Sequence, residues 1–305
     1  MQKIVPHLWF DTKAKEASEF YVQAFNAIGK DSKIVSSQVI HDTPSGDCDF
    51  LTFELGGYSF MAISAGPYFK LNPSISFMLN FDPSQDEKAE EHLNLLWEKL
   101  SEGGEALMPL DQYFFSKRYG WVKDKYGVTW QLILTDPDGD ERPFIVPSMM
   151  FANDIYGKAE EATDFYISVF KNAKRGQISH YGAGMEPNKE GSVMFTDFML
   201  EGQWFAAMDA SGAHDFIFNE AVSLLVHCDS QEEIDYYWEK LSFVPESEQC
   251  GWLKDKYGVS WQIAPREMED MMKNGTPIQT ERVTKAFLSM KKFDLAKLRD
   301  AYEGK

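Results

Sequence analysis

The chain has 305 residues, of which 44% are apolar and 26% charged, a composition typical of folded globular proteins and not of disordered or fibrous ones. Its 30 basic and 48 acidic side chains give a formal net charge of −18, which disfavours nucleic-acid and membrane-surface partners because both carry negative charge. At roughly 150 residues per domain, the length predicts about two domains.

The first part of the chain switches between the periods of strands and of helices. Residues 14–25 carry an apolar stripe that predicts an amphipathic helix. Strands are predicted at residues 7–10, 33–41, 49–55 and 58–64. Gly56 and Gly57 fall between the last two, where a tight hairpin needs them. This order is one β-α-β-β-β unit.

The same order then restarts. Residues 74–80 are predicted as a strand, and residues 88–100 as a helix with its leucines and Trp97 on one face. Residues 121–122 and 128–134 are predicted as strands, joined by a turn at residues 124–127. The first half of the chain therefore holds two β-α-β-β-β units.

The second half of the chain repeats the first in the same order. The segment GWVKDKYGVTWQ at residues 120–131 returns as GWLKDKYGVSWQ at residues 251–262. Residues 136–143 between the copies are polar and rich in turn formers. We therefore predict a tandem duplication, with one domain at residues 1–136 and a second at residues 144–268.

Residues 269–305 are predicted to form a helical tail. One apolar stripe runs through Val283 and Phe287, and another follows Asp294, a residue suited to cap a helix N-terminus. We expect this tail to pack on the second domain. A helix that binds a partner is the alternative.

The cysteines and the first residues bear on location. Cys48, Cys228 and Cys250 are odd in number, widely spaced and outside any CxxC pair, which argues against a disulfide framework or a zinc knuckle. The sequence starts without the apolar core of a signal peptide, and no apolar run approaches the ~18 residues of a membrane span. We expect a cytoplasmic protein.

The repeated motifs resemble the PhnB-like branch of the vicinal oxygen chelate superfamily, which includes glyoxalases, bleomycin-resistance proteins and extradiol dioxygenases. The resemblance rests on PHLWFD at residues 6–11, WEKL at residues 97–100 and 238–241, and the repeated GWxKDKYGVxWQ segment. It implies an α+β fold of tandem paired βαβββ modules, glyoxalase/bleomycin-resistance-like, with four modules in two curled-sheet domains plus a C-terminal helix.

Some relatives carry the name 3-demethylubiquinone-9 3-methyltransferase. The sequence has no Gly-rich strand-to-helix turn followed by an acidic ribose ligand, the arrangement that would seat a nucleoside-type methyl donor. We therefore do not predict methyl transfer.

The superfamily resemblance also implies where a site would lie. In metal-dependent members, His and Glu ligands come from the first, fourth, fifth and eighth strands of a cup. The pocket candidates at or beside such positions are His7, Trp9, Ser76, Met78, Gln131, Ser148, Ser223 and Gln262. We expect His7, Ser76 and Gln131 to meet in the first domain, and the last three in the second.

These candidates make a poor metal cage. The first domain offers one imidazole without a carboxylate, and Ser148 replaces His7 in the second. A divalent ion loses its hydration shell on binding, and no anionic ligand here would offset that loss. We predict no metal and no other cofactor.

The repeated segment has a simpler structural interpretation as a hairpin. Gly127 and Gly258 would supply the positive φ of its turn, and the four tryptophans of the two copies would fill the space between sheet and helix. The aromatic segments 113–115 and 67–69 are expected to form loops that close over the cup or over the domain interface.

Three functions stay open at this stage. The first is a module that binds a small apolar or aromatic molecule, oriented by Gln131 and His7. The second is a lyase, isomerase or dioxygenase in which His7 acts as a general base, or helps Gln131 hold a weak metal. The third is a largely structural duplication, a pseudo-dimer within one chain. The sequence also leaves a homodimer open.

Overall fold

The computed structural model describes residues 2–43 and 45–305. The first repeat supplies β1 (Ile4–Phe10), α1 (Ala14–Asn26), β2 (Lys33–Thr43), β3 (Gly46–Leu55), β4 (Tyr58–Ser64), β5 (Ile75–Phe81), α2 (Ala89–Ser101), β6 (Glu105–Tyr113), β7 (Ser116–Lys123) and β8 (Thr129–Leu134).

The second repeat supplies β9 (Ile145–Ala152), the short 3-10 helix η1 (Asn153–Ile155), α3 (Ala159–Val169), β10 (Lys174–His180), β11 (Val193–Leu200), β12 (Gln203–Ala210), β13 (Val222–Cys228), α4 (Gln231–Leu241), η2 (Pro245–Ser247), β14 (Trp252–Lys254) and β15 (Ser260–Pro265). The tail consists of α5 (Arg266–Asn274), α6 (Pro277–Leu288) and α7 (Leu295–Glu303).

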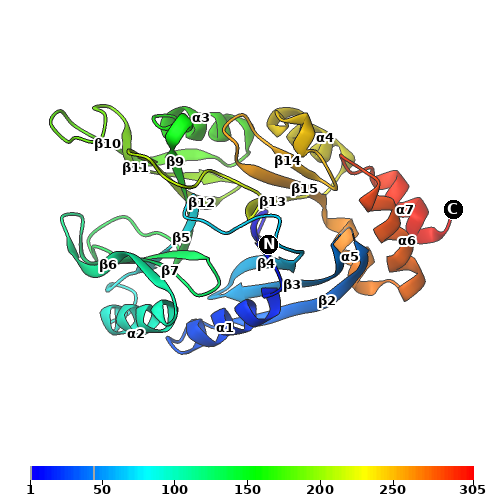
Figure 1. The fold of residues 1–305 in the computed structure, drawn as a ribbon, viewed down its shortest axis with the longest axis horizontal. Coiled ribbons are helices and arrows are strands. Elements are labelled where there is room, and N and C mark those ends of the chain that lie inside the picture. Colours follow the sequence, from blue (N-terminus) through cyan, green and yellow to red (C-terminus); the bar gives the residue numbers. More distant parts are fainter. Residues whose placement is uncertain (1, 44) are drawn as a thin grey trace.

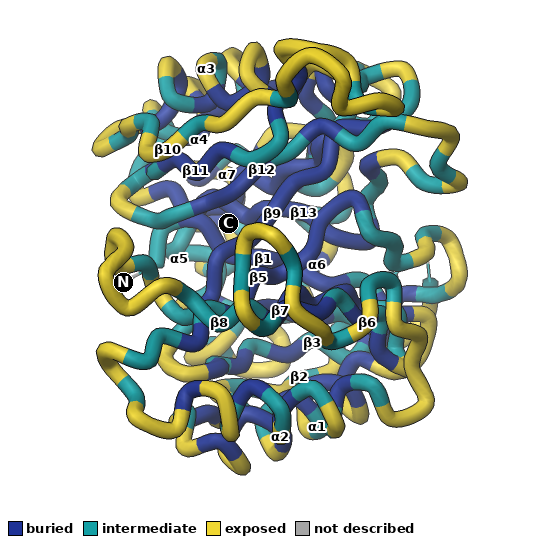
Figure 2. Tube along the Cα trace, turned by 90° about the vertical axis from the view of Figure 1, so that its left-hand side faces the viewer, coloured by how far each residue is buried: buried dark blue, intermediate teal, exposed yellow. Residues whose placement is uncertain are grey.

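The strands form two sheets that lie at opposite ends of the molecule (Figure 1). Sheet A has the strand order β14-β15-β13-β1-β4-β3-β2, and sheet B has the order β10-β11-β12-β9-β5-β8-β7-β6. Helices α1 and α2 lie on one outer side of the sheets, and α3 and α4 on the opposite side (Figures 1 and 2). The buried chain lies between these two helical layers (Figure 2).

Each sheet takes its strands from both repeats. In sheet A, β1 pairs antiparallel with β13, with His7 opposite Ser223. In sheet B, β5 pairs antiparallel with β9, with Ser76 opposite Ser148. The expectation that each repeat builds its own cup is therefore wrong, because a unit can pair with either of two closely similar partners. The boundaries 1–136 and 144–268 of independent domains stay a prediction.

Alternation along each central strand separates two faces. In β1, Ile4, Leu8 and Phe10 join the large buried cluster shared with the helices α1–α4. Val5 and His7 point to the other face, away from that cluster. We call the face of each sheet that turns away from α1–α4 its inner wall.

The repeated segment is held by a buried aspartate. Asp124 accepts hydrogen bonds from the backbone N–H groups of Tyr126 and Val128 and from the Trp130 indole, at 2.8, 3.2 and 2.8 Å. Asp255 is bonded in the same way in the second copy. Burial raises the pKa of Asp124 to about 6, although these donors oppose the rise. The hairpin interpretation is confirmed, with φ of 95° at Gly127.

Two parts of the chain differ from the predicted elements. Strand β6 was not predicted, and its pairing with β7 is broken by register shifts that obscure the alternating pattern. The tail contains three helices, and the Asp294 side chain accepts from the Lys297 N–H at the start of α7, as predicted. Among the described residues, no helix combines the length and apolar character needed to cross a bilayer.

Candidate functional site

The inner wall of sheet A is covered by the tail. Wall and tail side chains form a single apolar cluster, rich in methionine. Its buried members are Val5, Met61, Leu225 and Ala264 from the wall, and Met271, Val283, Phe293 and Leu298 from the tail. In Figure 1 the helices α5, α6 and α7 close this end of the molecule. The tail thus packs on strands of both repeats and not on the second repeat alone.

The contact between tail and sheet A is close. The N–H groups of Cys250 and Gly251 donate to the carbonyls of Met290 and Lys291, at 2.8 and 2.7 Å. The Phe293 ring lies 2.4 Å from where a Cβ on Gly251 would be, and Gly251 has φ of 80°. A side chain at Gly251 would therefore displace the tail.

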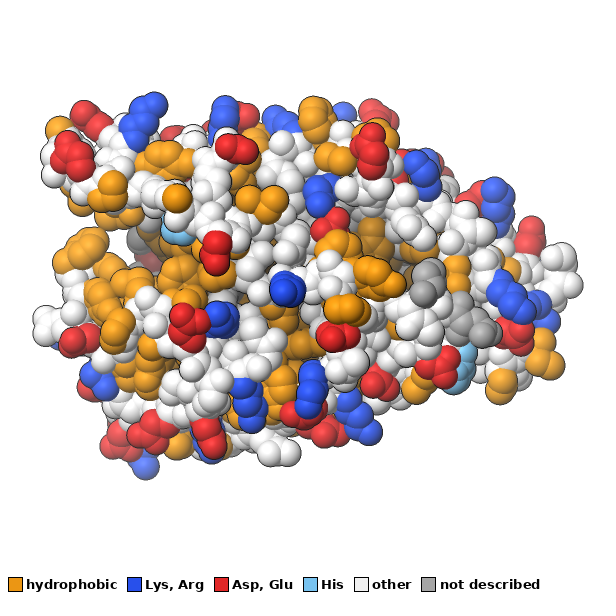
Figure 3. Space-filling view, in the orientation of Figure 1, with side chains coloured by type: hydrophobic (Ala, Val, Ile, Leu, Met, Phe, Trp, Pro, Cys, Tyr) orange, Lys and Arg blue, Asp and Glu red, His pale blue; other side chains and the backbone are white. Residues whose placement is uncertain are grey.

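The inner wall of sheet B has no such cover from the tail. Its buried cluster contains only Met78, Val146 and Ala206, with Ile133, Phe195 and Trp204 half-buried around it. Figure 3 shows the molecule hollowed at this end, with hydrophobic side chains on both sides of the hollow. The β6–β7 turn at its rim exposes 82% of Phe114 and 47% of Phe115. We call this hollow the sheet B cup.

A polar row crosses the inner wall of sheet A. The Gln262 amide donates to His7 Nδ1 at 2.8 Å and to Ser223 Oγ at 2.9 Å. His7 is buried between the rings of Phe50 and Trp252, and burial lowers its pKa to about 3. The imidazole is therefore neutral at pH 7. Since Nδ1 accepts, its proton is on Nε2, which is buried without a partner among the described residues.

A matching polar row crosses the inner wall of sheet B. The Tyr119 hydroxyl donates to Gln131 Oε1 at 2.8 Å, and the Gln131 amide donates to Ser76 Oγ at 2.7 Å. Ser148 lies opposite Ser76 in the strand register and takes the place that His7 has in sheet A. Sheet B thus keeps the Gln–Ser pair of sheet A and replaces the imidazole with a small hydroxyl.

The eight candidates fall into two groups of four. Sheet A brings His7, Trp9, Ser223 and Gln262 together, and sheet B brings Ser76, Met78, Gln131 and Ser148 together. The grouping of His7 with Gln131 is wrong, because the two lie in different sheets. Trp9 lies at the end of its row, where its indole donates to the Gly66 carbonyl at 2.8 Å and contacts Phe69.

Several inner-wall residues were not predicted. Ala206 stands opposite Ser148 in sheet B, where Met61 stands opposite His7 in sheet A. Trp121 stands opposite Gln131 and Trp252 opposite Gln262, so both face the inner walls and, contrary to the prediction, do not fill the space between sheet and helix. Directly opposed residues of an antiparallel pair point to the same face of a sheet. The position of Gln131 on the inner wall would therefore have placed Trp121 there as well, had the register of β7 and β8 been known.

The donors on these walls do not fit a divalent metal. The four equivalent positions in sheet A hold His7, Met61, Ser223 and Gln262, and sheet B has no imidazole among them. An imidazole, a thioether, a hydroxyl and an amide supply no negative charge to offset dehydration of the ion. Across residues 2–43 and 45–305, no group of three or more His, Cys, Asp or Glu side chains is placed to bind a metal.

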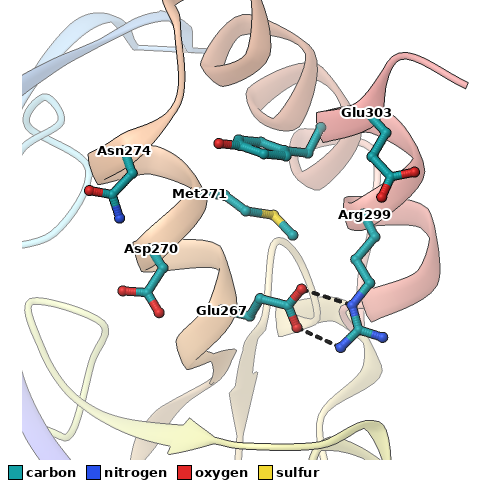
Figure 4. Close-up of a pocket in the computed structure, with 7 residues that line it drawn as sticks. Glu267, Asp270, Met271, Asn274, Arg299 and Glu303 are labelled. Atoms are coloured by element: carbon teal, nitrogen blue, oxygen red, sulfur yellow. Dashed lines mark hydrogen bonds and ion pairs between the residues drawn. The ribbon is translucent and has the colours of Figure 1, made fainter.

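Two further clefts lie outside the inner walls. One, of about 450 Å³, separates α5 from α7, and Figure 4 shows Met271 between the acidic side chains of its edge. Arg299 there donates two hydrogen bonds to Glu267, at 2.8 and 2.6 Å. The other, of about 410 Å³, is lined by the rings of Trp9, Phe69 and Tyr126 together with lysines and acids. The first cleft is the outer surface of the tail that covers sheet A.

Comparison with known families agrees with this geometry. The family model described as 3-demethylubiquinone-9 3-methyltransferase matches the chain twice, at residues 2–133 and 143–264. The chain belongs to this family. Its two matches coincide with the two sequence repeats, and the predicted PhnB-like resemblance is confirmed. No curated protein matches the sequence.

Several solved structures are also similar to the chain. A PhnB protein from Bacillus cereus is 36% identical over 44% of this chain and 100% of its own, with a TM-score of 0.38. A protein from Pseudomonas aeruginosa is 25% identical over 44% of this chain and 98% of its own, with a TM-score of 0.36. Glyoxalase I from Zea mays is 11% identical over 89% of this chain and 95% of its own, with a TM-score of 0.53. This last likeness concerns the fold alone and confirms the predicted fold class.

Proposed function

We propose that this family member is a metal-free binding protein whose sheet B cup holds a small apolar or aromatic molecule. The observation that carries the proposal is the difference in cover, since the tail fills one inner wall and leaves the other open. An uncovered concave wall of methionine and aromatic side chains with few convergent polar groups is the usual character of a ligand pocket.

Side-chain size favours the same end of the molecule. Ser148 and Ala206 in sheet B occupy the places that His7 and Met61 occupy in sheet A. Both replacements shorten the side chain, so they leave more room at the bottom of the sheet B cup. The polar row of Tyr119, Gln131 and Ser76 lies beside this room and could fix a ligand's orientation.

An enzyme that uses His7 has less support. A general base works best with a pKa near the working pH, and burial holds the pKa of His7 near 3. Its neighbour Gln262 occupies Nδ1, and the tail covers the wall on which it lies. Gln131, the proposed co-ligand of a weak metal, is in the other sheet.

A thermal-shift screen with aromatic small molecules, run with and without EDTA, tests the proposal. A ligand at 100 times its Kd should add about 2.7 kcal/mol to the free energy of unfolding, and EDTA should not change this gain. Stoichiometric metal retained after dialysis, or stabilisation that EDTA abolishes, would contradict the metal-free proposal.

A pair of variants locates the ligand. Ala206→Met gives the sheet B cup the side chain that sheet A has, and it should weaken binding at least tenfold by filling the space. Met61→Leu changes the equivalent residue of sheet A at nearly constant volume and should leave binding unchanged. Equal loss of binding in both variants would place the ligand elsewhere.

A further inference from the structure

The sheet B cup contains little net charge at its bottom. The Tyr119 hydroxyl stays protonated because burial raises its pKa well above the usual range. The charged side chain opposite Ala206 in the strand register is Asp197, and it is paired, since Arg142 donates to it at 2.7 Å. Asp197 also accepts from the Gln177 N–H, and the Arg142 guanidinium lies 4.0 Å from the centre of the Trp204 ring. A charged ligand would find no free counter-charge among these groups.

One buried N–H donor of the sheet B inner wall is left without a partner among the described residues. Gln131 uses its carbonyl for Tyr119 and its amide for Ser76, so its row is satisfied. The Trp121 indole nitrogen, on the residue opposite Gln131, is buried and has no acceptor among the described residues. A buried N–H donor without an acceptor is unfavourable, so an acceptor that enters the cup is favoured at this point.

Sheet A has no open equivalent. Trp252 takes the place of Trp121 there, and its neighbour His7 holds the unpartnered N–H beneath the tail. Within residues 2–43 and 45–305, an unpartnered inner-wall donor and an uncovered wall coincide in sheet B.

We infer that the sheet B cup selects uncharged, largely apolar ligands that carry a carbonyl-type acceptor, which receives a hydrogen bond from Trp121 Nε1. This inference rests on the proposed function and names the class of molecule that the cup takes. Methionine and aromatic side chains around the cup contact the apolar body of the ligand, and Trp121 distinguishes a ketone from a hydrocarbon of similar shape.

Three probes of one shape test the inference: naphthalene, 2-acetylnaphthalene and 2-naphthoate. Isothermal titration calorimetry on the full chain should show 2-acetylnaphthalene binding about 2- to 10-fold tighter than naphthalene, the range of one neutral hydrogen bond. The carboxylate 2-naphthoate should bind at least tenfold more weakly than the ketone, because no free cation offsets its dehydration.

The variant Trp121→Phe should remove the preference for the ketone while changing the affinity for naphthalene less than threefold. Trp252→Phe is the matched control in sheet A and should keep the preference. Because Trp121→Phe could disturb folding, a second measurement uses the wild-type chain with ¹⁵N-labelled indoles. One indole N–H resonance should move downfield with 2-acetylnaphthalene and not with naphthalene.

The outcomes separate the two proposals. If none of the probes binds, the proposed function fails, and this inference fails with it. If the three bind equally, if 2-naphthoate binds tightest, or if Trp121→Phe keeps the ketone preference, the sheet B cup still binds apolar molecules, but the role of Trp121 is wrong.

Discussion

The two inner walls of this protein are built from equivalent strands and reach opposite states. Sheet A has His7 and Met61 on its wall and packs the tail against Met61 and its apolar neighbours, whereas sheet B has Ser148 and Ala206 there and is not covered by the tail. Both keep a glutamine that donates to a serine. One wall is therefore part of the hydrophobic core, and the other is not covered by the tail.

The largest expected difference lies in the packing of the tail. Leu298 is fully buried in the sheet A cluster, so Leu298→Ala should lower the free energy of unfolding by about 2–5 kcal/mol. Phe114→Ala at the rim of sheet B should change it by less than about 0.5 kcal/mol, because that ring is exposed. Urea unfolding measures both. A cost below about 1 kcal/mol for Leu298→Ala would mean that the tail does not cover sheet A in solution.

The next difference concerns the stability of the protein at acidic pH. Between pH 6.5 and about 3 the unfolded chain protonates His7 and the folded chain does not, so stability falls as the pH falls. From pH 7.5 to pH 5 this amounts to about 2 kcal/mol. His7→Gln should remove that part of the loss, measured by urea unfolding at both pH values. An unchanged pH dependence in this variant would show that His7 titrates normally and is not enclosed.

A third experiment asks whether the two copies of the repeated segment still behave alike. Each aspartate accepts from two backbone N–H groups and an indole, and Asp255 also accepts from the Tyr166 hydroxyl. Asp124→Asn and Asp255→Asn each replace one accepting carboxylate oxygen by an NH₂ group that cannot accept. Each should cost about 1–2 kcal/mol, and the two costs should agree within about 1 kcal/mol, the net worth of the one further hydrogen bond that Asp255 accepts. Thermal or urea unfolding provides the comparison. Unequal costs would mean that the sheets have diverged in their core as well as on their inner walls.

The smallest effect is expected at Glu269 in the tail. Burial raises its pKa to about 7, and it lies 3.2 Å from His227, whose pKa is lowered to about 4 by burial. The folded chain holds this proton more tightly than the unfolded chain, so stability falls as the pH rises from 4.5 to 7. Glu269→Gln should flatten that decline by less than about 1 kcal/mol, since the side chain is 39% exposed. Asn80, the sheet B counterpart of His227, offers no such titration. A decline as steep as in the wild type would assign the proton to another group.

Much of this arrangement could be predicted from the sequence. Alternation placed Gln131 and Gln262 on walls and Trp130 and Trp261 in the core, because period-two patterns fix the face of a strand whatever its partner. The partner itself could not be predicted. The repeats are so similar that the local sequence allows β1 to pair with β13 of the fourth β-α-β-β-β unit or with β5 of the second. The structure shows that it pairs with β13.

The packing of the tail on sheet A could not be predicted from the sequence either. The tail stripe through Val283 and Phe287 predicts an apolar face, but it does not say which surface receives that face. Small residues on the inner wall of sheet B, such as Ala206, leave room there. Ala206 is recognised as small for its position only by comparison with Met61, the equivalent residue of sheet A. The sequence does contain these differences in side-chain size between equivalent positions of the two repeats. They indicate which wall is open only when the pairing register of the strands is known.

The antiparallel joints β1–β13 and β5–β9 have a consequence for how this gene could be divided. A break within residues 136–143 would leave two fragments. Each fragment would contain about half the strands of sheet A and half the strands of sheet B, and neither would contain a complete sheet. Such fragments should complement each other when produced together. Either one alone would expose two unpaired strand edges, β1 and β5 in the first fragment or β9 and β13 in the second, and should self-associate through them.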